Sequence, residues 1–221
     1  MILIGTPCYD GKVEWKTVRS LVGLGHLCAK ANIGYAMDVI PGDAFVDHSR
    51  NLIAHRFLKG GFRDLLFVDA DISFDPMDAA RLCKAEPEIV CGLYRIKKDR
   101  LVYPAKYFDP VEVHPSDPDL IRMSWAPTGF MRIRASVFEK MKEVWPDDWY
   151  ADTMTGENIY EFFPAGRRGH NRMSEDVGFC AKAMDAGINI YAMQNIPLEH
   201  TGAKSFESKW SMIGPSIEEA K

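Results

Sequence analysis

The chain has 221 residues, of which 47% are hydrophobic and 26% charged, so a single domain spanning residues 1–221 with one buried core is expected. Its formal net charge of -4 argues against a nucleic-acid partner, because such a partner needs a basic surface to neutralise phosphates. No apolar run approaches the ~20 residues that cross a bilayer, and the N-terminus lacks the basic leader of a signal peptide. We therefore expect no transmembrane segment and a cytoplasmic location. The five cysteines are widely spaced, which predicts reduced core residues rather than a zinc site or a redox pair.

The first half of the chain alternates strand and helix. Apolar stretches separated by turn residues predict strands at 2–5, 34–40 and 65–70 and helices at 13–31 and 47–58. A third helix is expected after Asp75-Pro76, because an N-cap residue there precedes proline at the first helical position. This alternation predicts a layered α/β sheet whose ligands lie outside the carboxyl ends of the strands.

The second half is more mixed. Strands are predicted at 89–94, 101–107, 120–125, 130–133 and 189–192, and helices at 135–144 and from Ser174 to about residue 186. Residues 145–173 are predicted to form one long loop, and a loop of this length in a compact domain is more often functional than idle.

Two acidic residues follow the most apolar predicted strand. In Asp69-Ala70-Asp71 the acids are two residues apart, so the period of a strand aims both at the same side of the sheet edge. Mg²⁺ and Mn²⁺ favour such carboxylates together with the phosphate oxygens of a substrate. The tripeptide therefore indicates a site for a metal-bound diphosphate, and a plain acidic turn is the alternative.

A second acidic pair opens the helix after Ser174. Glu175 and Asp176 have a structural explanation, because acids in a first turn are favoured by the helix dipole. Taking Val177, Cys180, Ala181 and Met184 as the buried face, helical spacing turns Asp176 toward a cleft and Glu175 nearly away from it. Asp176 is thus a candidate general base for deprotonating a hydroxyl.

His200 follows the predicted strand 189–192 and the turn residue Pro197. A lone histidine is more often structural than a ligand, but a position beyond a strand end favours the second interpretation. Imidazole joins carboxylates around Mn²⁺, so His200 and Asp71 would form a mixed site that phosphate oxygens complete.

Taken in chain order, these features resemble the GT-A glycosyltransferases. The resemblance covers roughly residues 2–202 and is carried by the Thr6-Pro7 turn, Arg50-Asn51, Asp69-Ala70-Asp71, Gly129-Phe130, Glu175-Asp176 and His200. It is strongest for the inverting, family-2-like group, whose membrane helices this chain lacks. It implies a Rossmann-like α/β/α sandwich with a mixed central sheet, in which residues 1–95 bind the nucleotide, 96–205 bind the acceptor and 206–221 form a C-terminal tail.

The resemblance also implies the roles of individual residues. Asp71 and His200 would bind Mn²⁺ or Mg²⁺, with Asp69 reaching the metal through water or touching the ribose, and Asp176 would deprotonate the acceptor. The nucleotide-diphosphate sugar would be held by Thr6, Pro7, Tyr9, Arg50, Asp69 and Ala70. A carbohydrate or other hydroxyl acceptor would contact Trp125, Thr128, Gly129 and Glu175, although Trp125 has an alternative place in the core.

One feature of the family is absent. Its paired acids after the second strand have no counterpart, because Asp38 lies within the predicted strand and Asp43 follows a Pro-Gly turn. Two alternative functions remain open. A sugar nucleotidyltransferase would need a glycine-rich phosphate loop, whereas residues 6–11 contain one glycine. A non-catalytic nucleotide-sugar or carbohydrate-binding module would have no use for the base at Asp176.

Overall fold

The computed structural model describes residues 1–212, with the exception of the side chain of Arg168. Within this part the centre is a nine-stranded mixed sheet. Its strand order is β2 (Tyr35–Pro41), β1 (Ile2–Cys8), β3 (Asp64–Val68), β9 (Phe130–Arg134), β5 (Ile89–Cys91), β14 (Ile190–Met193), β8 (Asp117–Trp125) and β6 (Lys106–Tyr107), with β7 (Val113–His114) also paired to β8. Pairs β1–β2, β1–β3 and β5–β14 are parallel, and the pairs that β9 and β8 make are antiparallel. The predicted α/β fold with a mixed sheet is confirmed.

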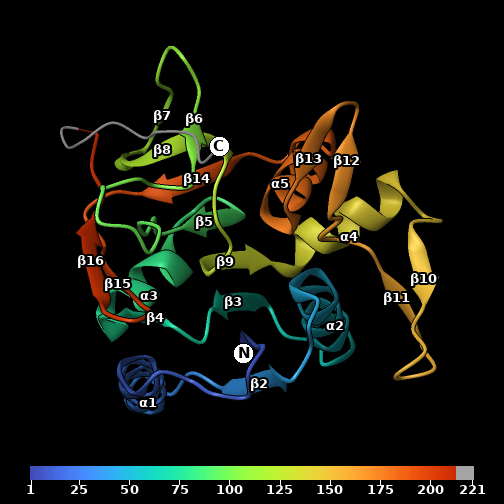
Figure 1. Cartoon of the computed structure of the whole chain (residues 1–221), viewed down its shortest axis with the longest axis horizontal. Helices are drawn as coiled ribbons and strands as arrows, with labels where there is room; N and C mark the ends of the chain where they lie inside the picture. The colour runs from blue at the N-terminus through green and yellow to red at the C-terminus, as the bar shows by residue number, and fades with distance from the viewer. Residues whose placement is uncertain (213–221) are drawn as a thin grey trace.

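Five helices cover the two faces of this sheet in the described part of the chain. They are α1 (Trp15–Lys30), α2 (Val46–Lys59), α3 (Pro76–Lys84), α4 (Ala135–Val144) and α5 (Glu175–Asp185). Figure 1 shows α1 and α3 on one side of the sheet and α2, α4 and α5 on the other. No helix among residues 1–212 is long and apolar enough to cross a membrane.

Each face of the sheet has its own apolar core. In β3, Leu65 and Phe67 pack with α2 and α4, whereas Leu66 and Val68 pack with α1 and α3. All four side chains are fully buried, because strand side chains alternate and both faces are covered. The continuous apolar run before Asp69 is therefore the central strand of a three-layer structure, and it fixes the position of the acids that follow.

The local signals for helix starts are confirmed. Asp75 caps α3 by accepting a hydrogen bond from the amide of Met77 at 2.8 Å, and Ser174 caps α5 by accepting one from Val177 at 3.4 Å. Such caps satisfy amide groups that have no partner within the helix, so they act over a few residues and can be recognised in the sequence.

The prediction of one loop over residues 145–173 is wrong. The segment contains two short antiparallel hairpins, β10 (Trp149–Ala151) with β11 (Asn158–Tyr160) and β12 (Gly166–Arg168) with β13 (Asn171–Met173). Three-residue strands are too short to show a period of two, so the sequence pattern did not reveal them.

A separate three-stranded sheet lies beside the main one, with β15 (Pro197–Thr201) between β16 (Ser205–Lys209) and β4 (Ile72–Phe74). His200 therefore lies within a strand, rather than beyond a strand end as predicted. Strand β16 includes the first residues of the predicted tail 206–221, whose residues 213–221 lie outside the described part of the chain.

Candidate active site

A cavity of about 360 Å³ lies at the carboxyl ends of β1 and β3. Three segments supply most of its lining: the turn after β1, the first turn of α2 and the tripeptide after β3. Its lining includes Pro7, Cys8, Tyr9, Asp10, Lys12, Glu14, Asp43, Val46, Ser49, Asp69, Ala70, Asp71, Lys97, Thr201 and Gly202. The expected position of the ligand site, outside the strand ends, agrees with this cavity.

A buried arginine joins three carboxylates on the inner side of the site. Arg50, on α2, is 2% exposed and donates from Nη2 to both oxygens of Asp69, at 3.0 and 3.4 Å. Its Nε lies 3.5 Å from Glu175 Oε1, and Nη2 lies 4.0 Å from Asp176 Oδ1. One guanidinium therefore faces three acids, and the excess of negative charge favours the binding of a cation nearby.

Asp69 is held against a glycine. Its amide donates to the carbonyl of Gly129 at 2.9 Å, and a Cβ at Gly129 would lie 2.4 Å from Asp69 Oδ2 and 2.3 Å from the Tyr94 hydroxyl. Only glycine fits this approach. Burial raises the pKa of Asp69, whereas the charge of Arg50 lowers it, and burial has the larger effect.

Asp176 is positioned by Thr128, which lies just before β9. The Thr128 amide donates to Asp176 Oδ1 at 3.1 Å, and the Thr128 hydroxyl donates to the same oxygen. Burial raises the pKa of Asp176 to about 7, in spite of the opposing effect of Arg50. A carboxyl with this pKa is suited to accept a proton near neutral pH.

The prediction that Glu175 points away from the site is wrong. The buried face of α5 is formed by Phe179, Cys180 and Ala183, so it is turned relative to the predicted face. Glu175 lies one turn before Phe179 and therefore shares this face. The helix also packs closely at Gly178, where a Cβ would lie 1.9 Å from the carbonyl oxygen of Pro164.

Asp71 and His200 lie close together because Asp71 immediately precedes β4, which pairs with β15, the strand that carries His200. His200 Nε2 lies 3.5 Å from Asp71 Oδ1, and the amide of Thr201 donates to the carbonyl of Asp71 at 2.8 Å. His200 Nδ1 lies 2.9 Å from the carbonyl oxygen of Arg95. Since a carbonyl only accepts, Nδ1 carries a proton, so Nε2 is the ring nitrogen that faces Asp71, as a donor to the carboxylate in the imidazolium form and as a lone pair in the neutral form.

Lys97 contacts the same carboxylate and was not predicted from the sequence. Its ammonium forms an ion pair with Asp71 Oδ2, on the other side from His200. Burial raises the pKa of Asp71, but the hydrogen bonds and charges of His200 and Lys97 outweigh burial and leave the pKa below its ordinary value. Lys97 lies in an irregular segment after β5, where neither periodicity nor a motif marks a lysine as functional.

The donor set suits a small divalent cation that brings its own further ligands. Two ligands that share such an ion at about 2.1 Å lie about 3 Å apart in octahedral geometry, and Asp71 Oδ1 and His200 Nε2 are at 3.5 Å. Among residues 1–212, no group of three or more His, Cys, Asp and Glu side chains is arranged to hold a metal ion. Mg²⁺ and Mn²⁺ sites often use only one or two protein ligands, with water and phosphate completing the shell.

The remaining predicted residues are distributed around these two clusters. Pro7, Tyr9 and Ala70 line the cavity, with Tyr9 72% exposed. Thr6 is fully buried and does not line it. Trp125, at the end of β8, is partly buried and packs against the apolar core, which agrees with the alternative interpretation of this residue.

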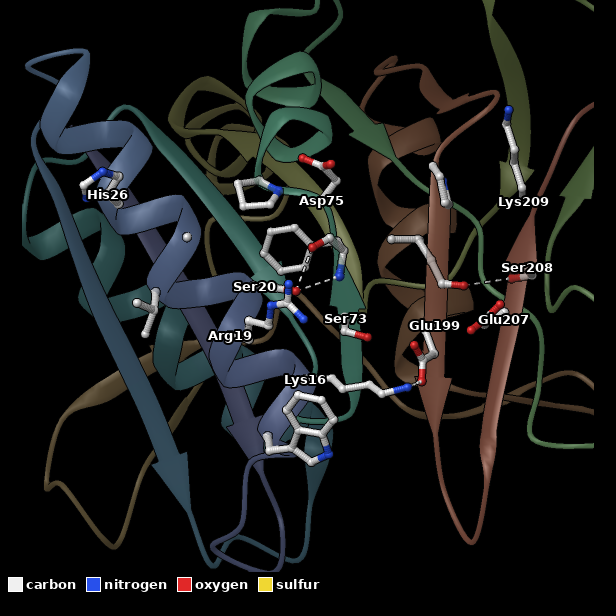
Figure 2. Close-up of a pocket in the computed structure, with 17 residues that line it drawn as sticks. Lys16, Arg19, Ser20, His26, Ser73, Asp75, Glu199, Glu207, Ser208 and Lys209 are labelled. Atoms are coloured by element: carbon white, nitrogen blue, oxygen red, sulfur yellow. Dashed lines mark hydrogen bonds and ion pairs between the residues drawn. The ribbon is translucent and has the colours of Figure 1, made fainter.

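A larger cavity, of about 1130 Å³, lies elsewhere, between α1 and the sheet of β4, β15 and β16. Figure 2 shows Lys16 reaching from α1 to Glu199 on β15, and Ser20 bonded to the backbone of Phe74 at the floor. No residue predicted for the metal, the base or the donor lines this open groove. The smaller cavity is the candidate active site, because it contains Asp69 and Asp71.

Known proteins resemble this chain in structure rather than in sequence. No family model matches the sequence, and no curated protein is significantly similar to it. Among solved structures, A197 from STIV is similar over 100% of this chain and 97% of its own, at 17% identity and a TM-score of 0.57. This similarity shows a shared fold.

Solved glycosyltransferases are also similar in structure. A Drosophila β-1,4-galactosyltransferase 7 variant, in complex with manganese, UDP-Gal and xylobiose, aligns over 95% of this chain and 71% of its own at 12% identity and a TM-score of 0.47. TarS from S. aureus, in complex with UDP, aligns over 87% of this chain and 57% of its own at 13% identity and a TM-score of 0.48. Because both TM-scores are below 0.5, neither similarity bears on the activity of this chain.

Proposed function

We propose that this protein is a metal-dependent glycosyltransferase that moves a sugar from a nucleotide-diphosphate sugar to an acceptor hydroxyl, with inversion at the sugar. One observation carries the proposal. The pair of Asp71 and His200 is suited to a cation, and a carboxyl with a pKa of about 7, Asp176, shares the Arg50 guanidinium with Asp69. A transferase needs both groups, whereas a binding module needs no base.

The metal site would consist of Asp71 and His200, with Asp69 close by. Bound Mn²⁺ or Mg²⁺ would stabilise the negative charge that grows on the leaving diphosphate. The chain itself supports this site, since the carbonyl of Arg95 engages Nδ1 and keeps Nε2 of His200 directed at Asp71, where its lone pair would bind a cation.

The base would be Asp176. Both donations from Thr128 go to Oδ1, so we assign Oδ2 to accept the proton of the acceptor hydroxyl. Arg50 links Asp176 to Asp69, which lines the donor cavity, and thereby fixes the base relative to the donor. If attack comes from the side of Asp176 and the diphosphate leaves on the side of Asp71, the displacement is in line and inverts the sugar.

Donor contacts would come from Pro7, Tyr9, Ala70 and Asp69 along the cavity, with Arg50 acting through Asp69 and Thr6 supporting the turn. Asp43, the acid after the Pro-Gly turn, has its oxygens occupied by Phe45 N, His48 and Ser49. We therefore assign Asp43 to shaping the loop. Thr128 and Gly129 are buried behind Asp176 and Asp69, so they would position these carboxylates rather than touch the acceptor, which would meet Glu175 and the partly exposed Trp125.

The test is a panel of UDP-, GDP- and dTDP-sugars with Mn²⁺, in which release of nucleoside diphosphate and thermal stabilisation are both measured. Slow hydrolysis of one donor, abolished by EDTA, is the expected result. Failure of every donor to be hydrolysed or to stabilise the protein would overturn the proposal. Release of pyrophosphate from a nucleoside triphosphate and a sugar phosphate would instead identify a nucleotidyltransferase.

The base assignment is tested with Asp176→Asn. The variant is expected to bind the donor as the unaltered protein does and to lose ~100-fold or more in turnover, because proton transfer contributes that much. Asp147→Asn, at an exposed position before β10, is the matched control and should retain full turnover. Wild-type-like turnover of Asp176→Asn would refute the assignment.

A further inference from the structure

The segment after β5 is held in a fixed shape although it is irregular. Arg95 donates from Nη2 to the carbonyls of Lys98 and Asp99 at 2.6 and 2.8 Å. The amide of Ile96 donates to Val102 at 3.0 Å, and Asp99 forms an ion pair with Lys204 on the turn before β16. The backbone that carries Lys97 is therefore closed on itself and tied to the neighbouring turn.

This segment contacts both residues of the proposed metal site, Asp71 and His200. The carbonyl of Arg95 orients His200, and the ammonium of Lys97 pairs with Asp71. The stem of Lys97 crosses Gly202, where a Cβ would lie 2.9 Å from Lys97 Cδ, so glycine lets the lysine approach. Lys97 remains 36% exposed in its side chain and lines the cavity, so its ammonium has room to move.

The ammonium and a divalent cation compete for one carboxylate. In the structure Asp71 is flanked by His200 at Oδ1 and by Lys97 at Oδ2. A cation bound to Asp71 would repel the ammonium over this short distance, and it would also take the negative charge that now holds Lys97 in place. Lys97 must then find another anion within the reach of its flexible stem.

The other anion available to Lys97 is the diphosphate, which binds together with the metal. A divalent cation neutralises the roughly two negative charges of an intact sugar nucleotide but leaves the departing nucleoside diphosphate with a net charge of roughly -1, so one more cation at the cavity is favoured as the sugar leaves. Lys12 also lines the cavity but is exposed on the turn after β1 and has no ion pair with the acids after β3 among the described residues. Lys97 already lies beside the position that the metal would take.

We propose that Lys97 is a diphosphate-binding residue with two positions. It neutralises Asp71 when the site holds neither metal nor nucleotide, and it transfers its ammonium to the diphosphate when the metal and the donor bind. This inference rests on the proposed function and adds a donor-binding residue to it.

The two positions predict opposite effects of one substitution. Lys97→Met keeps the length of the stem and removes the charge, so Mn²⁺ alone should bind ~5-fold more tightly, because its competitor is gone. A nucleoside diphosphate at saturating Mn²⁺ should bind ~10-fold more weakly, because a charge-assisted hydrogen bond is lost. Both dissociation constants are measured by calorimetry, with UDP, GDP and dTDP as nucleotide probes.

Two further variants separate charge from structure. Lys98→Met removes the neighbouring exposed lysine, which does not line the cavity, and should change neither constant. Lys97→Arg keeps the positive charge and should bind Mn²⁺ and the nucleotide within ~3-fold of the unaltered protein. Thermal melting of each variant establishes that the fold is retained.

The outcomes distinguish this inference from the function on which it rests. If the unaltered protein binds Mn²⁺ and a nucleoside diphosphate but Lys97→Met changes neither constant, or weakens both, the inference is overturned and the function stands. If the unaltered protein binds neither ligand, both are overturned. Tighter Mn²⁺ together with weaker nucleotide supports the transfer of Lys97 from Asp71 to the diphosphate.

Discussion

Asp176 provides a test that needs no substrate, because its carboxyl affects stability as well as chemistry. Its folded-state pKa of about 7 is raised from 3.8 by burial, so the folded protein holds a proton there that the unfolded chain releases at lower pH. The stabilisation from this proton is fully present below pH 3.8 and is lost as the pH rises through about 7. Above that pH, the fold holds a buried negative charge.

The structure sets the size of the effect. The difference between 3.8 and about 7 corresponds to about 4 kcal/mol at most, since each pKa unit is worth about 1.4 kcal/mol. Because the Asp176 side chain is 21% exposed and its charge is shared with Arg50, we expect about 2 to 4 kcal/mol. Asp176→Asn removes the ionisable group but keeps an oxygen that accepts from Thr128.

The assay is urea unfolding of the unaltered protein and of Asp176→Asn at pH 5 and at pH 8. The gain in the free energy of unfolding from the substitution should be about 1 to 2.5 kcal/mol larger at pH 8 than at pH 5, because only the part of the titration between these two pH values contributes, whereas Asp147→Asn should show no such difference. Donor hydrolysis by the unaltered protein should rise about tenfold from pH 6 to pH 8, because the fraction of ionised Asp176 rises to the same extent. An equal gain at both pH values would show that this carboxyl is not charged and buried in the native protein.

Three other predictions concern neighbouring parts of the site. Gly129→Ala should cost about 1 to 3 kcal/mol in stability and weaken donor binding, because its methyl group would displace Asp69 or the Tyr94 hydroxyl. Urea unfolding measures the change in stability and calorimetry the change in donor binding, and unchanged values would contradict the close packing at Gly129. Asp71→Asn should abolish the thermal stabilisation by Mn²⁺ while leaving the melting temperature without metal within a few degrees, and retained stabilisation would place the metal elsewhere. Burial lowers the pKa of His48, but its two aspartate partners outweigh burial and raise this pKa. The stabilisation that the protonated His48 gains from them is present below pH 6.5 and is lost as the pH rises through the folded-state pKa. His48→Gln should therefore destabilise the protein at pH 6 and by less at pH 9, and equal losses at both pH values would refute this prediction.

The strand, the acids and the helix starts that surround the site could be predicted from the sequence. The apolar run 65–68 predicted a buried strand, and the acids after it were expected at the sheet edge that the structure places next to the cavity. The caps at Asp75 and Ser174 were predicted because a side chain there bonds to an amide only a few residues away. These features are local, so the order of residues is enough to specify them.

The charges of the site could not be predicted in the same way. Arg50 was expected to touch the nucleotide, but it lies buried among Asp69, Glu175 and Asp176. Its partners follow it by 19, 125 and 126 positions, and no periodic pattern connects such distances. Glu175 was assigned to the wrong face because the buried face of α5 depends on its packing against separate elements, and the close approach of Gly178 to Pro164 is one such contact.

The sequence by itself determined the alternation of strands and helices, the starts of α3 and α5, and the presence of acids after the central strand. Each depends on neighbouring residues through backbone hydrogen bonds and the repeat of apolar side chains. Only the tertiary structure decided that Lys97 and His200 take opposite sides of Asp71, that the carbonyl of Arg95 orients the imidazole, and that burial raises the pKa of Asp176. Ion pairs and desolvation depend on distances through space, which exist only once the sheet has brought remote segments together.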